Sequence, residues 1–484
     1  MRQEPWRLES TMERKRARAI FTNDAECDDM NSVVHLLLYT NDIELEGLVL
    51  SSSIFHYAGD PEQGIEPKRW AGGSWMWEYL DAYEQVQDRL RAHDPRYPTA
   101  DELREVTCIG NIKTTGDMDE DTDGSELIRK AILKDDPRPI HLLAGGGTNT
   151  IARALKHIDD EYRRIDQWDD MYRRVCDTAI IYMIVTQDTT YRDYISNAWP
   201  DLRTLHCTNI MGIAFLFGKE ICPPRVQEIM RAPWIEEHLL NKGPLLAKYH
   251  TWADGHVYPG EEDRSQFGSN PGLLGGNWWG HEDRVRHDMI SEGDSPSFLY
   301  LVDTGLRSLE NPSWGGWGGR FMRNPNNEFN SQADYWQSAS DDNRDACCGS
   351  SYQFSRWIED WWNEFSVRAT WSVEPDDTKV NHAPELSIEG GVNVAASAGE
   401  NVMLVAQASD PDDDELDYEW FRYHEADTYS SGVTVAAKGL ACEVQVPADA
   451  KPSDTIHIIC RVSDAPAKRD DYLTAYQRIV ITIS

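Results

Sequence analysis

Asp24, Asp28 and Asp29 fall within six residues near the start of the chain, and their carboxylates are the groups best suited to chemistry. Residues 18–22, just before them, predict a short buried strand, and apolar residues recur at helical spacing over 30–38. Carboxylates this close repel one another unless a hard cation or bound hydroxyl groups neutralise them. The pattern therefore indicates a cation site, with an acidic helix N-terminus as the structural alternative.

The elements around this loop decide where it lies in a fold. Residues 45–51 predict a second strand, so the segment from residue 18 forms a strand–helix–strand unit. In open α/β sheets, ligands bind beyond the carboxyl ends of the strands, which is where the acidic loop falls. His56 follows the second strand and is expected at the same edge, although a lone histidine there is usually only hydrogen-bonded within the fold.

Later segments place further polar groups beyond predicted strands. Residues 139–144 predict a strand, followed by the glycine-rich turn 145–147 and Asn149. Such a turn lets the backbone approach a ligand, although an ordinary tight turn is the alternative. Asp294 precedes an apolar run at 298–302, and its alternative role is a helix cap.

Another predicted strand, at residues 180–185, ends in a polar loop. Asp188 lies in that loop and Asn197 follows it, so both can reach the same edge of the sheet. For Asn197 an ordinary surface position is the alternative.

The stretch 22–53, TNDAECDDMNSVVHLLLYTNDIELEGLVLSSS, resembles the opening of the nucleoside hydrolase superfamily. It is most similar to the nucleoside hydrolase-like domain of bacterial cellulose-binding proteins, and the resemblance extends to an immunoglobulin-like C-terminal module. It implies an α/β fold over residues 16–372, with an open, mostly parallel sheet and flanking helices. A polar, proline-flanked linker at 373–384 and seven short alternating runs over 385–484 agree with an all-β immunoglobulin-like sandwich as the second domain.

The resemblance also implies a calcium site and a reaction. Asp24, Asp29 and Asp294 would bind Ca²⁺, together with a backbone carbonyl at Asn149 or its neighbour. A metal-activated water would attack the anomeric carbon of a furanoside directly, and Asp24 would accept the proton of that water.

The substrate residues follow from the same resemblance. Asp28 and Asn197 would bind sugar hydroxyls, with Asp188 and His56 close by. The superfamily has a histidine before the last metal aspartate, where this chain has Gly293, so the leaving group lacks an obvious acid. That replacement admits an O-linked furanoside or oligosaccharide as well as a nucleoside.

Three functions therefore stand side by side. The first is a calcium-dependent glycosidase acting on an N- or O-linked ribofuranoside or other furanoside. The second is a non-catalytic protein that binds cellulose or another polysaccharide through the same cleft and the tryptophan-rich loops 249–281 and 311–320, which could instead be anchored by their rings. The third is a structural or cell-surface protein whose sandwich mediates contacts. A homo-oligomer is compatible with each.

Composition narrows the partners. The formal charge of −36 argues against binding nucleic acids, which requires a basic face. No apolar run is long enough to span a bilayer, and the charged first 18 residues lack the apolar core of a signal peptide, so the sequence as written predicts a cytoplasmic protein. A secreted or periplasmic protein is the alternative if the start is trimmed.

Cys442 and Cys460 lie on separate predicted strands of the C-terminal domain. They could form a disulfide or remain a reduced buried pair.

Overall fold

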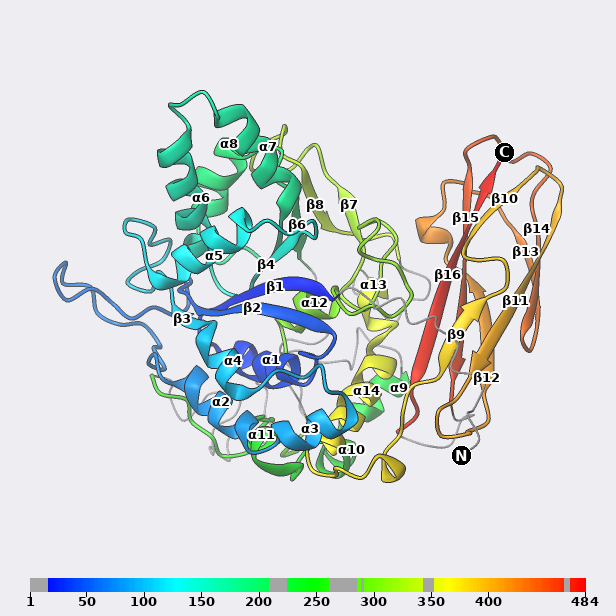
Figure 1. The fold of residues 1–484 in the computed structure, drawn as a ribbon, viewed down its shortest axis with the longest axis horizontal. Coiled ribbons are helices and arrows are strands. Elements are labelled where there is room, and N and C mark those ends of the chain that lie inside the picture. Colours follow the sequence, from blue (N-terminus) through cyan, green and yellow to red (C-terminus); the bar gives the residue numbers. More distant parts are fainter. Residues whose placement is uncertain (1–15, 209–223, 261–284, 289–290, 343–351, 465–470) are drawn as a thin grey trace, which may run out of the picture.

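The computed structural model describes residues 16–208, 224–260, 285–288, 291–342, 352–464 and 471–484 (Figure 1). In these segments a large α/β body carries one sheet, and two smaller all-β sheets lie beside it. The sheet of the α/β body is parallel except for its last strand, β7, which pairs antiparallel with β8. Its strands, in spatial order, are β3 (Thr107–Ile109), β2 (Ile43–Leu50), β1 (Ala17–Asn23), β4 (Ile140–Ala144), β5 (Ala179–Ile184), β6 (Thr204–Cys207), β8 (Tyr335–Ser338) and β7 (Phe321–Arg323).

Helices cover both faces of this sheet, because strands buried on both sides present apolar residues in both directions. In β1, Ile20 points into one core, whereas Ala19 and Phe21 point into the other. The core on the side of Ile20 is covered by α5 (Asp123–Leu133), α6 (Asn149–Tyr162), α7 (Trp168–Thr178), the π-helical turn η1 (Tyr191–Ile195) and α8 (Ser196–Ala198).

The second core, on the side of Phe21, is the larger of the two. Helix α1 is amphipathic by sequence but is buried along its whole length in this layer. The helices on this side are α1 (Cys27–Leu37), α2 (Trp75–Glu84), α3 (Gln87–His93), α4 (Ala100–Glu105), α9 (Pro224–Ile229), α10 (Ala232–His238), α11 (Gly243–Leu246), α12 (Ser295–Leu299), α13 (Tyr352–Ser355) and α14 (Ile358–Trp371).

The C-terminal part is a sandwich of two four-stranded sheets around its own core. Exposed and buried residues alternate along its strands, as in β11, because each sheet has one face on the core and one in solvent. One sheet has the order β10 (Asn393–Ala396), β16 (Thr474–Ile483), β15 (Thr455–Ser463) and β12 (Asp417–Arg422), and the other β13 (Thr434–Lys438), β14 (Ala441–Gln445), β11 (Asn401–Ser409) and β9 (Glu385–Ile388). The predicted fold class, an open α/β sheet followed by an all-β sandwich, is confirmed.

The two parts share apolar packing. Tyr423, Ile459 and Tyr476 of the sandwich belong to the same buried cluster as the larger core of the α/β body. The ring of Trp357 lies 5.5 Å from that of Tyr476, centroid to centroid. The α/β core therefore ends on side chains that the sandwich supplies.

The tryptophan-rich loop 311–320 takes part in this junction. Trp317 is buried, and the ring of Trp314 packs edge-on against His457 in β15, with centroids 5.2 Å apart. In this loop the aromatic rings therefore anchor the chain, which is the second of the two roles expected for them, rather than lining a cleft. In the other loop, Trp252 is buried as well, and residues 261–281 lie outside the described segments.

Two further expectations are settled in the described residues. Cys442 and Cys460 are both buried and free, which corresponds to the reduced pair. Among the helices of the described segments, none combines the length and the hydropathy needed to cross a bilayer.

Candidate functional site

Four aspartates from three separate segments meet at the carboxyl end of β1. Asp24 follows the strand directly, Asp28 and Asp29 lie in the first turn of α1, and Asp294 immediately precedes α12. One carboxylate oxygen from each of Asp28, Asp29 and Asp294 lies within 4.8 Å of the others, and the backbone N–H of Asp24 donates to Asp29 Oδ1 at 3.1 Å. The structure thus brings together the aspartates that the sequence singled out. We call Asp24, Asp28, Asp29 and Asp294 the acidic cluster.

The backbone within this cluster is strained. Ala25, between the strand and the helix, has a φ of +67°, a left-handed conformation that a residue with a side chain rarely adopts. Such strain costs about 1–3 kcal/mol and persists only where the surrounding structure imposes it, most often at functional sites. It turns the chain so that Asp24 and the first turn of α1 face the same point.

Burial and mutual repulsion shape the electrostatics of the acidic cluster. All four aspartates are at most 6% exposed. Burial, followed by the neighbouring negative charges, raises the pKa of Asp28, Asp29 and Asp294 well above the usual value. Burial also acts on Asp24, but hydrogen bonding and charge interaction with His56 outweigh it and lower the pKa of Asp24. One carboxylate is therefore held ionised, while burial and neighbouring negative charge outweigh any compensation of the other three by the described residues.

Several buried oxygens of the acidic cluster lack a short hydrogen bond from the described residues. Asp28 Oδ1 and Asp294 Oδ2 accept no hydrogen bond there, and Asp24 Oδ2 has a longer contact, 3.6 Å, with His56 Nδ1. Buried polar atoms are nearly always satisfied, and one left unsatisfied costs about 1–3 kcal/mol. Acceptors of this kind in one buried cluster fit a bound cation or the hydroxyl groups of a ligand.

The glycine turn after β4 closes one side of the acidic cluster. A Cβ atom on Gly145 would lie 3.0 Å from Asp294 Cγ, and one on Gly146 would lie 2.8 Å from Asp24 Cβ. A side chain at Gly146 would force a shift and one at Gly145 would press on Asp294, so glycine lets the backbone approach the carboxylates. The three glycines are therefore more than an ordinary turn sequence.

Asn149 and Asp188 form a hydrogen-bonded support beside that turn. Asn149 lies in the first turn of α6, where its backbone N–H donates to Asp188 Oδ2 at 3.0 Å and its side-chain amide donates to Ser52 Oγ at 3.0 Å. Asp188 also accepts hydrogen bonds from Thr148 and Thr190. The backbone of Gly145 and Gly146 approaches the acidic cluster closely. The ligand role predicted for the Asn149 carbonyl and the substrate role predicted for Asp188 stay predictions.

His56 lies next to the acidic cluster, as its position after β2 predicted. Its Nδ1 atom is 3.6 Å from Asp24 Oδ2 and 3.7 Å from Glu26 Oε2, and the histidine is 1% exposed. Glu26 lies within the acidic motif of the sequence, but no role was predicted for it. Its position two residues after Asp24 was the feature of the sequence that could have indicated a place near the acidic cluster.

Asn197 lies apart from these groups. It belongs to the short helix α8, its side chain is exposed, and its amide donates to the backbone carbonyl of Arg192 at 2.7 Å. Helix α8 lies on the face of the sheet opposite to α1 and α12 (Figure 1). The structure therefore places Asn197 in its alternative role, at the surface, and its predicted contact with sugar hydroxyls has no support in this geometry.

A buried network that sequence reasoning missed holds Asp294 in place. His35 Nδ1, on α1, lies 2.6 Å from Glu292 Oε2, and neither side chain is exposed. Ser295 Oγ donates to the same carboxylate at 2.6 Å, and the Tyr249 hydroxyl donates to its other oxygen. The position of Glu292 two residues before Asp294 was the only signal in the sequence.

Aromatic and histidine side chains border α1 next to the acidic cluster. The rings of His250 and His256 stack with centroids 3.7 Å apart, and Tyr258 packs edge-on against His256 at 4.3 Å. Burial raises the pKa of Tyr258 well above the usual value, and the charge of Asp28 contributes to this rise. Asn31, on α1, holds the segment by exchanging hydrogen bonds with the backbone of His250.

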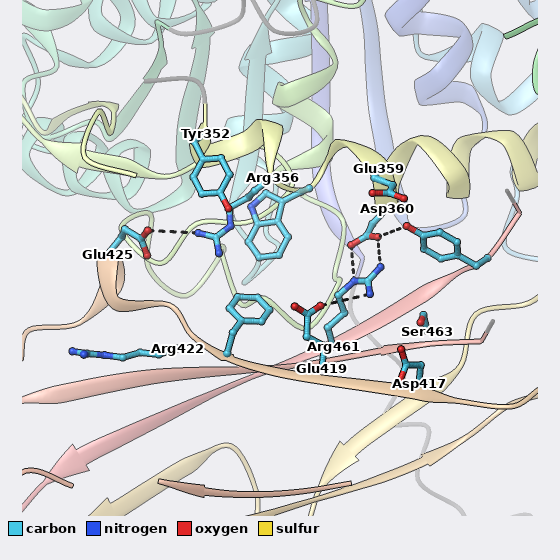
Figure 2. A pocket seen from close by; sticks show the side chains of 13 residues that line it. Tyr352, Arg356, Glu359, Asp360, Asp417, Glu419, Arg422, Glu425, Arg461 and Ser463 are labelled. Atoms are coloured by element: carbon cyan, nitrogen blue, oxygen red, sulfur yellow. Dashed lines mark hydrogen bonds and ion pairs between the residues drawn. The ribbon is translucent and has the colours of Figure 1, made fainter. Parts of the chain in front are cut away.

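A separate cavity of about 610 Å³ lies between α13 and α14 on one side and the sandwich strands β12 and β15 on the other (Figure 2). Arg461 Nη2 is 2.6 Å from Asp360 Oδ1, and Arg356 Nη1 is 3.7 Å from Glu425 Oε1. Arg356 Nη1 and Trp357 Nε1 are buried and donate no hydrogen bond to the described residues. The cavity is lined by aromatic rings together with positively and negatively charged side chains: Tyr352, Trp357, Phe421, Tyr472, Arg356, Arg422, Arg461, Glu359, Asp360, Asp417, Glu419, Glu425 and Ser463.

Comparison with known proteins identifies relatives of both parts. A family model described as "Cellulose-binding Sde182, nucleoside hydrolase-like domain" matches residues 18–321, and one described as "Cellulose-binding protein Sde0182, C-terminal domain" matches residues 401–483. A solved structure of a nucleoside hydrolase-related hypothetical protein from Saccharophagus degradans, described as associated with carbohydrate metabolism, is similar with a TM-score of 0.72 and 25% identity. The match covers 97% of this chain and 100% of that one. No curated protein matches. The resemblance read from residues 22–53 is confirmed.

Proposed function

The chain belongs to the Sde182 family of cellulose-binding proteins, and we propose that its nucleoside hydrolase-like domain is a calcium-dependent hydrolase of a furanosidic bond, N- or O-linked. The observation that carries this proposal is the convergence of Asp28, Asp29 and Asp294, from segments far apart in the sequence, with buried oxygens that accept no hydrogen bond from the described part of the chain. In a purely structural cluster of this kind, the repulsion between the carboxylates would destabilise the fold with no compensating function.

The donor set fits calcium. Asp24, Asp29 and Asp294 offer only oxygen ligands, and the backbone of Gly145 and Gly146 lies close against Asp294 and Asp24. Hard oxygen donors in this number suit Ca²⁺ better than zinc. Calcium bound there would supply Lewis acidity toward a water and toward two neighbouring sugar hydroxyls.

The residues of the chain then divide the work. Asp24 is the proton acceptor for the attacking water, since its pKa is held below the usual value and the carboxylate is ionised at neutral pH. His56, next to Asp24, orients that carboxylate. Asp28, whose Oδ1 accepts no hydrogen bond from the described residues, accepts one from a sugar hydroxyl. Direct displacement by water inverts the anomeric carbon.

The leaving group sets the remaining specificity. Gly293 offers no side chain before Asp294, so a departing base or alcohol must take its proton from another segment or from solvent. His56, beside Asp24, and His256, packed on Tyr258, are two imidazoles near the acidic cluster that could supply that proton. A substrate whose leaving group is stable as an anion needs the least help from a general acid.

Calcium titration by calorimetry tests the proposal. We expect one site in the metal-stripped protein, lost in Asp24→Ala and in Asp294→Ala but retained in Asp170→Ala, which alters an exposed aspartate. Turnover of nucleosides and nitrophenyl furanosides should then require calcium and vanish in Asp24→Asn. Wild-type protein that binds no calcium would overturn the mechanism.

A second candidate function is carbohydrate binding without turnover, which the family's description favours. The cavity between α14 and the sandwich supports it, because Trp357 Nε1 is a buried donor with no hydrogen-bond acceptor among the described residues, Arg356 lies beside it in an ion pair with Glu425, and ring faces suit sugar rings. Retention on insoluble cellulose that is lost in Phe421→Ala but kept in Asp24→Asn would place binding in this cavity. Loss of retention in Asp24→Asn alone would place it at the acidic cluster.

A further inference from the structure

Two histidines and an aspartate meet where the α/β body joins the sandwich. His93 ends α3, and Asp377 and His382 lie in the segment between α14 and β9. His93 Nδ1 is 3.2 Å from Asp377 Oδ1, and His382 Nε2 is 2.9 Å from the same oxygen. One ligand atom from each residue lies within 4.8 Å of the others. We call His93, Asp377 and His382 the junction triad; it shares no residue with the acidic cluster.

The outer nitrogen of each imidazole is already engaged. His93 Nε2 lies 2.6 Å from the backbone carbonyl of Glu374, so this nitrogen must carry the hydrogen. His382 Nδ1 lies 3.1 Å from Asp412 Oδ1, a carboxylate that also requires a donor. In the neutral imidazoles, the two inner nitrogens would therefore turn lone pairs toward the carboxylate of Asp377. Either a second proton on each ring or a cation between the three groups resolves that conflict.

We propose that the junction triad binds a divalent transition-metal ion of the zinc class, with His93 Nδ1, His382 Nε2 and Asp377 as ligands. Metal-ligating histidines regularly donate their other N–H to a backbone carbonyl or a carboxylate, and both arrangements occur here. Two imidazole nitrogens and one carboxylate are a common zinc donor set.

The spacing agrees with tetrahedral coordination. At zinc–ligand distances of 2.0–2.1 Å, neighbouring ligands are about 3.4 Å apart, and the two nitrogen–oxygen separations are 3.2 and 2.9 Å. Asp377 is 66% exposed, so water can complete the coordination from the open side. The His93 and His382 rings both pack on Trp371, with centroids 5.2 and 5.8 Å from it, which limits their movement.

A metal ion here joins three parts of the chain. His93 belongs to the α/β body, Asp377 and His382 to the connecting segment, and Asp412, which holds His382, lies between β11 and β12 of the sandwich. Binding would favour the observed arrangement of the parts over any in which they separate. The site is thus structural, a clip at the domain junction.

Zinc titration of the full chain with calcium in excess, which occupies the acidic cluster, tests this proposal. We expect one zinc site, lost in His93→Ala and in His382→Ala and retained in His424→Ala, which alters an exposed histidine of the sandwich. Asp412→Ala should weaken zinc about tenfold to a hundredfold, as loss of a group that supports a ligand does.

Cobalt substitution provides a readout that needs no variant. Co²⁺ bound to wild-type protein should give the intense visible absorption of a four-coordinate site, and Asp377→Asn, at an exposed position, should weaken that absorption while the protein stays folded. Wild-type protein that binds neither zinc nor cobalt would overturn the proposal, as would zinc binding unchanged in both histidine variants. Because calcium binding is measured separately, failure here leaves the hydrolase proposal intact.

Discussion

His35 on helix α1 lies 2.6 Å from Glu292, and this contact joins the helix that carries Asp28 and Asp29 to the segment that carries Asp294. The pair is enclosed by aromatic rings, with His35 stacked on Phe365 at 3.9 Å between centroids. Just over half of the chain separates the partners, yet their contact links the two segments that carry the carboxylates.

Removing Glu292 should disturb both stability and metal binding. Breaking one side of a buried pair costs about 3–5 kcal/mol, so Glu292→Ala should lower the free energy of unfolding by that amount and weaken calcium. Denaturant unfolding and calorimetry measure the two effects. In a double-mutant cycle, His35→Ala together with Glu292→Ala should cost less than the sum of the single changes; simple additivity would show that the pair does not act as a unit.

A methyl group on Gly145 should weaken the binding of calcium. Its Cβ would lie 3.0 Å from Asp294 Cγ, and accommodating it costs about 1–3 kcal/mol, so affinity should fall roughly tenfold to a hundredfold in Gly145→Ala. Gly432→Ala is the matched control, since a Cβ there meets no atom within 4 Å. Equal calcium affinities in the two variants would show that the glycine turn is not part of the metal site.

The acidic cluster should make the metal-free protein less stable as pH rises. The folded-state pKa values of Asp28, Asp29 and Asp294 are raised, so between about pH 4 and those values the folded state holds protons that the unfolded state has released. Their contribution to stability is therefore largest at low pH and is lost as pH rises through the folded-state pKa values.

Asp28→Asn isolates this effect from other titrating groups. In the presence of a chelator at pH 7.5, the variant should be about 1–3 kcal/mol more stable than the wild type, and the difference should vanish near pH 4. Thermal unfolding at both pH values measures it. A variant that is less stable than the wild type at pH 7.5 would mean that Asp28 is compensated by groups within the protein.

Loss of Arg478 should loosen the junction of the two parts. This buried side chain donates to the backbone carbonyls of Leu306 and Trp314, each at 2.7 Å, and of Gly315 at 3.1 Å. Arg478→Met leaves these carbonyls unsatisfied, at a cost of about 3 kcal/mol or more. Limited proteolysis should then cut the connecting segment 373–384 faster, whereas Arg173→Met, at an exposed ion pair, should leave the rate unchanged.

The parts of the site that follow strand ends could be predicted from the sequence. Asp24 and the Gly145–Gly147 turn come directly after buried apolar strands, and parallel strands bring their carboxyl ends to one edge. Asp294 required the family resemblance, because it precedes a short helix rather than following a strand. The division at residues 373–384 was read from composition alone and stays a prediction.

Other features depend on tertiary packing that leaves no local pattern. Glu292 is a charged residue in a polar stretch, and nothing near it in the sequence indicates complete burial against His35. Trp314 looks like a ring available to a sugar, but its position against His457 depends on where the sandwich lies. Asn197 follows a strand as a ligand-binding residue would, yet the π-helical turn after β5 carries it to the opposite face.

The apolar cluster that runs from the α/β body into Tyr423, Ile459 and Tyr476 affects how this architecture can be taken apart. A chain that stops after Trp371 would expose the rings of Trp317 and Trp357 to water and would tend to aggregate. The sandwich is therefore not an interchangeable appendage. Shuffling it onto another catalytic domain would require a matching set of aromatic residues on the recipient, so the two parts are expected to be inherited and to diverge together.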